Sequence, residues 1–323
     1  MNDSGKSVDC IYIAASTHDA RYTRICVASI RYFYPYVPIR LLVGGKLQRG
    51  LAAELRRYWN VTVAVVPSGD YGWGFVKLEA LFGKTGERFL VLDSDTAVVG
   101  DVLALRAKSD ALFFVDDERL PDANSRQLFY DWDKLRAIDP KAVSAIPGFN
   151  VGQWFGTAGL VKREEFDRWV EWTLPRRLTY PQYFMGGEQG VMNYVLLQKE
   201  AYEGLRIERH TLMRWPGYPN ALDGLDAASV AAKTAPPLVI HWAGAKAIFL
   251  RNMAGSDLLQ FFENYYYSRL PAARLRRMLA LCRHVWVHVS FEISRRIKLR
   301  WQIWFGQPKP ANPPVLVKRA IGS

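Results

Sequence analysis

The segment Phe89-Leu-Val-Leu-Asp93-Ser-Asp95 places two carboxylates two positions apart at the end of an apolar run. The apolar run predicts a buried strand. Positions i and i+2 of an extended backbone face the same side, so both carboxylates can converge on one cation. Mg²⁺ and Mn²⁺ bind oxygen ligands of this kind. The segment therefore predicts a divalent-metal site at Asp93 and Asp95, although a polar turn after a strand has a similar composition.

Strands alternate with helices along the first half of the chain. Apolar, β-branched runs predict the strands, and apolar residues at helical spacing predict the helices between them. Such alternation is typical of an α/β protein with a parallel sheet, in which ligands bind beyond the carboxyl ends of the strands. The expected strands are 10–15, 39–43, 61–66, 88–93 and 111–115, and the expected helices are 19–34, 51–59 and 75–82.

The second half of the chain is less regular. It contains an aromatic and glycine-rich stretch over 148–159, and apolar spacing predicts helices over 162–172 and 188–197. A short apolar strand over 238–240 ends at His241. Taken alone, a histidine at the end of a strand is more often a hydrogen-bonded structural residue than a metal ligand.

Four motifs follow one another along the chain. FVKLEALF, with Lys77, precedes RFLVLDSDTAVVGDV, and the later motifs are Gly148-Phe-Asn150-Val-Gly152, Gly186-Gly-Glu188-Gln189 and His241-Trp-Ala-Gly244. Their order resembles family 8 glycosyltransferases, which include glycogenin and the bacterial galactosyltransferases that extend lipooligosaccharide. The resemblance covers roughly residues 9–250. The chain departs from the family at Lys77, which is usually Arg, at Glu188, which is usually Asp, and at Lys246, which stands one residue closer to His241.

The resemblance implies a fold, an activity and a set of site residues. The implied fold is α/β, a GT-A type Rossmann-like mixed sheet flanked by helices, with a basic C-terminal helical appendage. The implied activity is metal-dependent transfer of a sugar from a nucleotide-sugar, a UDP-sugar above others, to a saccharide or glycolipid acceptor. His241 would complete the Mn²⁺ or Mg²⁺ site with Asp93 and Asp95. The implied catalytic residues are Asn150, Glu188 and Gln189, and the implied donor-binding residues are Ala14, Ala15, Ser16, Lys77, Ser94, Gly244 and Lys246.

The resemblance also implies a mechanism that retains anomeric configuration. The acceptor would then attack from the face that the diphosphate leaves, and Glu188 or Gln189 would lie near the opposite face. A divalent cation would act as a Lewis acid on the leaving diphosphate. Lys77 would add a preorganised positive charge.

The net charge of +12 is concentrated at the C-terminus. From Arg269 onward the chain has twelve Lys and Arg residues and one acid, Glu292, whereas residues 1–268 are close to neutral. The basic residues alternate with Trp, Phe, Leu, Val and Ile, so this tail could bind an anionic membrane surface or pack on the main domain as a helix. Nucleic acid is the less favoured partner. We expect a flexible segment over 1–8, a catalytic domain over 9–265 and a basic amphipathic helical tail over 266–323.

Composition limits the cellular setting. Half of the 323 residues are hydrophobic, which is enough for a core, and the three cysteines form no CxxC pair. The N-terminus lacks the apolar core of a signal peptide, and no run reaches the length of a membrane span. We therefore expect a cytoplasmic protein, peripheral at the inner face of the membrane if the tail binds lipid.

Three other functions are alternatives to the glycosyltransferase. A phosphatase of the haloacid-dehalogenase type also ends a strand in DxD, but it carries the motif near the N-terminus, with Thr or Val two residues after the second Asp. Here Ala97 stands two residues after Asp95. A nucleotidyltransferase needs a glycine-rich loop after the first strand, and residues 16–21 contain no glycine. A non-catalytic sugar- or lipid-binding protein with the same fold remains open.

Overall fold

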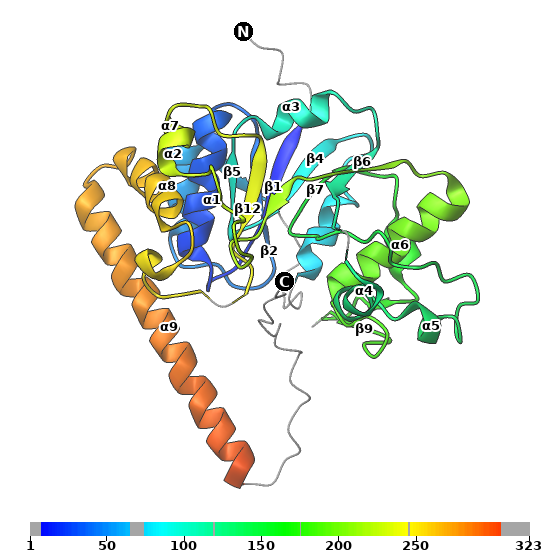
Figure 1. The fold of residues 1–323 in the computed structure, drawn as a ribbon. Helices are drawn as coiled ribbons and strands as arrows, with labels where there is room; N and C mark the ends of the chain where they lie inside the picture. The colour runs from blue at the N-terminus through cyan, green and yellow to red at the C-terminus, as the bar shows by residue number, and fades with distance from the viewer. Residues whose placement is uncertain (1–7, 65–73, 119, 175, 245, 305–323) are drawn as a thin grey trace.

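A mixed seven-stranded sheet forms the centre of the molecule, in the strand order β10-β6-β7-β4-β1-β2-β3 (Figure 1). The computed structural model describes residues 8–64, 74–118, 120–174, 176–244 and 246–304. Strands β4, β1, β2 and β3 run parallel, whereas β7 is antiparallel to both β4 and β6. The strands are β1 (Cys10–Ala15), β2 (Ile39–Val43), β3 (Val61–Val63), β4 (Arg88–Asp93), β6 (Phe113–Asp116), β7 (Gln153–Thr157) and β10 (Ile207–His210).

A small second sheet joins distant parts of the chain. It consists of β5 (Thr96–Val99), β12 (Leu238–His241) and β11 (Met213–Arg214), in the order β11-β12-β5. Strands β5 and β12 are antiparallel, and their register pairs Thr96 with His241. This pairing brings the end of β12 beside the end of β4, because β5 begins directly after Asp95. Two further strands, β8 (Val170–Glu171) and β9 (Arg177–Leu178), pair with each other.

Helices cover both faces of the main sheet (Figure 1). None of those in the described ranges has the length and apolar character of a membrane-spanning segment. Short 3₁₀ turns lie at Phe75–Ala80, Arg163–Phe166 and Leu250–Asn252. The α-helices are α1 (Ala20–Phe33), α2 (Leu51–Trp59), α3 (Val102–Ala107), α4 (Asp122–Leu128), α5 (Trp132–Leu135), α6 (Glu188–Glu203), α7 (Ala227–Ala231), α8 (Ser256–Ser268) and α9 (Ala273–Trp304).

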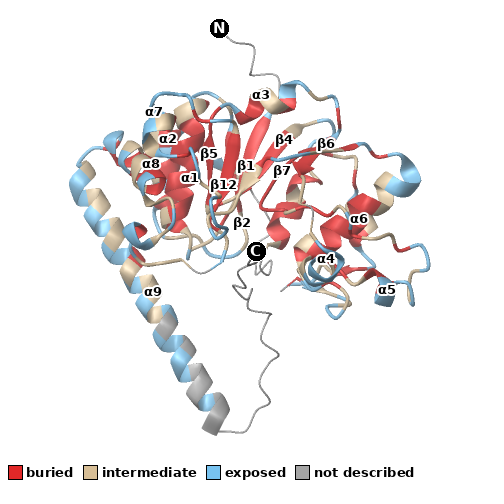
Figure 2. Cartoon of the chain, in the orientation of Figure 1, coloured by how far each residue is buried: buried red, intermediate tan, exposed pale blue. Residues whose placement is uncertain are grey.

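The central strands are buried on both faces (Figure 2). Ile11 and Ile13 of β1 pack into the hydrophobic core that also contains residues of α1, α2 and α8. Cys10 and Tyr12, which alternate with them, pack into the core on the α6 side. This arrangement explains why β1 has a continuous apolar sequence, since a strand with both faces covered has no solvent face.

The sequence predicted most of these elements, and the expected mixed α/β sheet with flanking helices is confirmed. The helix expected over 162–172 is wrong, because the chain makes a single 3₁₀ turn there and then forms β8. The turn is closed by the Glu165 side chain, which accepts a hydrogen bond from the Lys162 backbone. Trp169 and Val170 then enter the core. The segment expected as a helix over 75–82 is a 3₁₀ turn, and the strand expected over 61–66 ends at Val63, with 65 and 66 outside the described residues.

Helix α9 is anchored to the domain by a buried carboxylate. Glu263 of α8 accepts from Arg21 of α1 at 2.6 Å and from Arg277 of α9 at 2.7 Å. Both bonds are charge-assisted, and Glu263 is almost fully buried. From this anchor α9 runs past the loop that follows β1 and extends beyond the body of the molecule (Figure 1). The anchor therefore fixes the direction of the basic helix relative to α1 and α8.

Replacing Glu263 should destabilise the whole fold. Glu263→Ala leaves the partly buried guanidinium of Arg21 without its carboxylate, so we expect the free energy of unfolding to fall by about 3 kcal/mol. Urea unfolding followed by circular dichroism measures this change. Glu171→Ala is the matched control, because it removes an exposed ion pair with Arg177 and should leave the midpoint unchanged. Equal midpoints for the two variants would contradict the anchor.

Candidate active site

A tight turn, not a continuous strand, carries the two aspartates of the DxD segment. Asp93 is the last residue of β4, and Ser94 and Asp95 form the turn into β5. The expectation that an extended backbone aligns the two carboxylates is therefore wrong. The turn is held by the Asp93 backbone N–H, which donates to the Gly152 carbonyl at 2.7 Å, and by the Thr96 hydroxyl, which donates to the Asp93 carbonyl at 2.8 Å. These bonds point both carboxylates toward β12.

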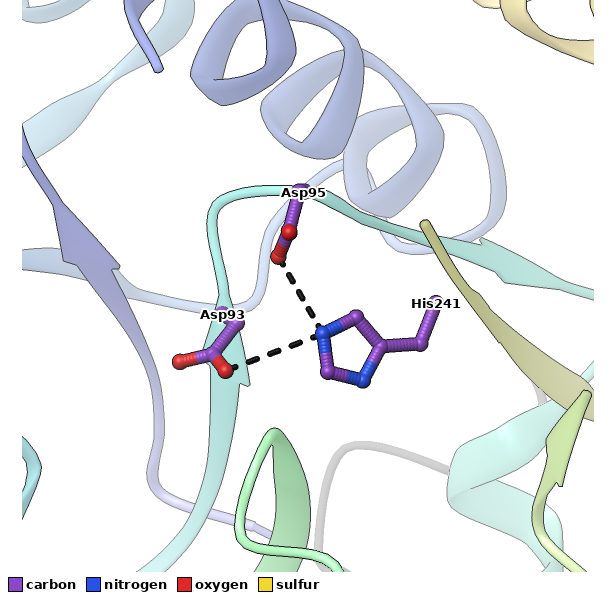
Figure 3. Close-up of side chains that lie close together, drawn as sticks. All are labelled: Asp93, Asp95 and His241. Atoms are coloured by element: carbon purple, nitrogen blue, oxygen red, sulfur yellow. Dashed lines mark ion pairs between the residues drawn. The ribbon is translucent and has the colours of Figure 1, made fainter. Parts of the chain in front are cut away.

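His241 meets the two aspartates at the end of β12 (Figure 3). Its Nε2 atom lies 3.3 Å from Asp95 Oδ1 and 3.8 Å from Asp93 Oδ2. Each of the three residues offers a ligand atom, and all of these atoms lie within 4.8 Å of one another. Atoms that share one ion at bond lengths of about 2.1 Å have separations of this order. Two carboxylates and one imidazole also suit Mn²⁺, which accepts both oxygen and nitrogen.

Gly152 leaves the space that the imidazole of His241 occupies. A Cβ atom at this position would lie 2.3 Å from Cε1 and 2.7 Å from Nδ1 of His241. It would also lie 2.8 Å from Oδ1 of Asn150. Any side chain here would therefore push the ring away from the aspartates, so the glycine is part of the candidate metal site.

Lysine ammonium groups neutralise the buried carboxylates. Lys246 Nζ lies 2.8 Å from Asp95 Oδ2 and 3.8 Å from Asp19 Oδ1. Burial alone would raise the pKa of Asp95, but the neighbouring His241 and Lys246 hold it below its usual range. The ammonium of Lys246 also lies over the ring of Tyr22, at 5.5 Å from the centroid. Asp95 is therefore ionised and ready to bind a cation at neutral pH.

Lys77 connects the DxD turn to the start of α6. Its buried Nζ lies 3.1 Å from Asp93 Oδ1 and 3.2 Å from Glu188 Oε1. Burial raises the pKa of Glu188, and Asp93 adds to the rise, whereas the charge of Lys77 opposes it. Oε2 of Glu188 is buried without a hydrogen-bond partner in the described structure. Gly74 fits directly against this carboxylate, since a Cβ there would lie 2.0 Å from it.

The amide side chains beside the site are engaged with the backbone. Gln189 accepts from the Val151 N–H at 3.3 Å and donates to the Leu128 carbonyl at 3.1 Å. Asn150 accepts from the Gly152 N–H at 2.7 Å. Asn193 exchanges two bonds with the backbone of Phe149, each 2.9 Å long. These amides fix the loop that carries Asn150 and Gly152 against α6.

The remaining predicted donor-binding residues lie around the same edge. Ala14 pairs with Asp93 in the β1–β4 register, and Ala15 ends β1. Ser94 is buried in the turn. The Ser16 hydroxyl donates to Asp19 at 2.9 Å. Gly244 has a φ of +87°, a left-handed conformation that favours glycine, and its carbonyl lies 3.4 Å from Lys246 Nζ.

Four contributors were not singled out as site residues from the sequence. Asp19 and Tyr22 face Lys246, Gly152 gives space to His241, and Asn193 holds the loop before it. Asp19 could have been found from its place just after β1, where ligands bind in such sheets. Tyr22 gave no signal, because an aromatic residue in an apolar helix usually belongs to the core.

Comparison with solved structures shows the fold. No protein-family model and no curated protein sequence matches the chain. The galactosyltransferase LgtC, solved with donor and acceptor sugar analogues, superposes with a TM-score of 0.50 at 14% identity, over 79% of this chain and 95% of that one. An active-site mutant of LgtC gives 0.51 at 13% identity, over 79% and 94%. The bifunctional glycosyltransferase WbbM gives 0.49 at 15% identity, and the chain spans half of its length, with 82% of this chain covered.

The likeness to the two LgtC structures confirms the expected GT-A glycosyltransferase fold. The seven-stranded mixed sheet, with β7 antiparallel to both of its neighbours, and the helices on its two faces match that architecture. The identity is too low for activity or donor to follow from the fold alone.

Removing a ligand should weaken metal binding directly. We expect Asp95→Ala and His241→Ala each to lower the Mn²⁺ affinity at least about tenfold. Mutation of a residue that only hydrogen-bonds to a metal ligand already lowers metal affinity about 10- to 100-fold, and these variants lose a ligand itself. Calorimetric titration of the purified protein with MnCl₂ measures this affinity. Asp110→Ala, which removes a carboxylate on the exposed surface, should bind Mn²⁺ like the unaltered chain. Unchanged binding in both site variants would rule out this site.

Gly152→Ala should displace the imidazole without removing any ligand. The added methyl group has no room beside His241, so Mn²⁺ affinity should fall about tenfold or more. Gly83→Ala is the control, because its Cβ would meet its neighbours at ordinary contact distances of 3.5 Å and beyond. A Gly152→Ala protein that binds Mn²⁺ normally would show that the ring position is not critical.

Proposed function

We propose that the protein is a metal-dependent glycosyltransferase that moves a sugar from a nucleotide-sugar, a UDP-sugar above others, to a saccharide or glycolipid acceptor. The observation that carries the proposal is the cluster of Asp93, Asp95 and His241 at the carboxyl edge of a GT-A sheet. Ligands of open α/β sheets bind at this edge. Support from the fold comes from LgtC, which was solved with donor and acceptor sugar analogues.

The diphosphate of the donor would bind on the Lys246 side of the cluster. Asp93, Asp95 and His241 would hold Mn²⁺ or Mg²⁺, which supplies Lewis-acid stabilisation of the leaving diphosphate. Burial lowers the pKa of Lys246, but Asp95 and Asp19 raise it by more than burial lowers it. The ammonium of Lys246 therefore stays charged at neutral pH. A charged ammonium that already touches Asp95 is in place to contact a phosphate oxygen.

The sugar would lie against the Lys77–Glu188 pair. The buried Oε2 of Glu188 has no hydrogen-bond partner among the described residues, whereas both ends of the Gln189 amide are bonded to the backbone. We therefore assign the sugar-facing role to Glu188 and a positioning role to Gln189. Burial raises the pKa of the Glu188 carboxyl, and the ion pair with Lys77 opposes that rise. A fixed carboxylate on this side would stabilise positive charge as it develops on the sugar ring in a reaction with retention.

The decisive measurement is turnover of the donor. The protein, with Mn²⁺ and a panel of UDP-, GDP- and ADP-sugars, should release nucleoside diphosphate fastest from a UDP-sugar, and chelation of the metal should stop the release. Asp95→Ala should lower kcat/KM at least about 100-fold, since it removes a ligand of the ion that stabilises the transition state. Asp110→Ala, far from the site on the exposed surface, should keep full activity.

Two outcomes would replace the proposal. Tight binding of a nucleotide-sugar without release of nucleoside diphosphate, with any saccharide or glycolipid acceptor, would make the protein a binding protein on this fold. Hydrolysis of phosphomonoesters that depends on Asp93 would make it a phosphatase.

NMR of the product tests retention separately, because the anomeric coupling shows the configuration of the new bond.

A further inference from the structure

Helix α9 exposes a row of apolar side chains on the face opposite the buried His284. The side chain of Trp286 is 72% exposed and that of Ile293 is 52% exposed. Residues three and four positions apart lie on one face of a helix. The residues with this spacing, here named the outer stripe, are Leu275, Leu279, Cys282, Trp286, Val289, Ile293 and Ile297, and all are exposed.

The opposite face of the same helix contacts the domain along part of its length. His284 is buried against the domain, and the Phe291 ring contacts His18, in the loop after β1, at 5.3 Å between centroids. Arg277 is bound to Glu263. The apolar residues of the outer stripe are therefore not needed for packing on the domain. A long row of exposed apolar side chains is typical of a surface that binds a partner.

Charge identifies the class of that partner. Helix α9 contains eight Lys and Arg residues and a single acid, Glu292. A second copy of the chain would place the same positive charge against it, which disfavours a dimer through this face. Basic residues that flank a stripe of Trp, Leu, Ile and Val are complementary to an anionic lipid headgroup region above an acyl layer.

The length and direction of α9 also fit a surface. Its 32 residues span about 48 Å, and the distal half extends beyond the body of the molecule (Figure 1). It projects on the side of the loop that follows β1, which is also the side of the carboxyl edge where Asp93 and Asp95 lie. A helix lying along a flat surface in this way would face the candidate active site toward that surface.

We propose that the outer stripe docks the protein on an anionic lipid bilayer, with α9 lying in the headgroup region. The apolar side chains insert, and the basic residues pair with lipid phosphates. The protein is then a peripheral one, held by a single helix with its site toward the membrane. This docking does not depend on sugar transfer, so it can be tested in a protein without activity.

Flotation of the full-length protein with lipid vesicles tests the docking. Vesicles of phosphatidylcholine and phosphatidylglycerol in equal parts should carry the protein to the top of the gradient, and vesicles of phosphatidylcholine alone should not. The double variant Trp286→Ser/Ile293→Ser should need at least about tenfold more anionic lipid, because two inserted side chains are lost. The matched control is Tyr36→Ser/Tyr202→Ser, which removes two exposed aromatic rings elsewhere and should float like the unaltered chain.

A label on the stripe tests insertion without changing its apolar residues. Cys282 is exposed, whereas Cys10 and Cys26 are buried, so a polarity-sensitive fluorophore will attach at Cys282. Its emission should shift to the blue with anionic vesicles and stay constant with neutral ones. This readout also keeps the test decisive if the double variant fails to fold.

Four results would overturn the proposal. Equal flotation with neutral and anionic vesicles would remove the role of charge, and equal flotation of the double variant and its control would remove the role of the stripe. A dimer in sedimentation that dissociates in the double variant, without vesicle binding, would assign the stripe to a second copy. Binding of RNA or DNA in preference to vesicles would assign the basic residues to nucleic acid.

Discussion

The balance of charge at the carboxyl edge of the sheet is the constraint on which the site depends. Asp19, Asp93, Asp95 and Glu188 are opposed by Lys77 and Lys246, with every contact at 3.8 Å or less. Carboxylates brought together out of water repel one another and are driven toward protonation. Counted as formal charges, four carboxylates and two ammonium groups leave two negative charges when His241 is neutral. One divalent cation restores neutrality, which is why the cluster suits a metal better than a further lysine.

The scaffold produces this balance by joining segments that are distant in sequence. Strand β5 continues from the DxD turn and pairs with β12, and this register places His241 beside Asp95. The loop before β7 is fastened to α6 by Asn193 and leaves a glycine where the imidazole needs room. Secondary structure thus sets the distance between the ligands, and small residues and amides set their orientation. Both contributions are needed to bring the three ligands together.

Apolar runs and helical spacing in the sequence predicted several strands and helices correctly. The bounds of β1, β2, α2 and β4 follow directly from apolar runs and helical spacing. The motifs also pointed to Asp93, Asp95 and His241, which the fold brings together. Sequence spacing could not predict the turn at Ser94, the β8 strand in place of a helix, or the backbone bonds of Gln189. These depend on contacts across the fold that outweigh local preference.

The contact between Lys246 and Asp95 makes the loading of metal and of donor interdependent. An ion that takes Asp95 deprives the ammonium of its nearest anion, and a diphosphate arriving at the same place would provide a new one. Binding of the metal and binding of the diphosphate would thus favour each other. Thermodynamic reciprocity requires each ligand to raise the affinity for the other by the same factor. Lys246 would then exchange its contact with Asp95 for a contact with the diphosphate once both ligands are bound.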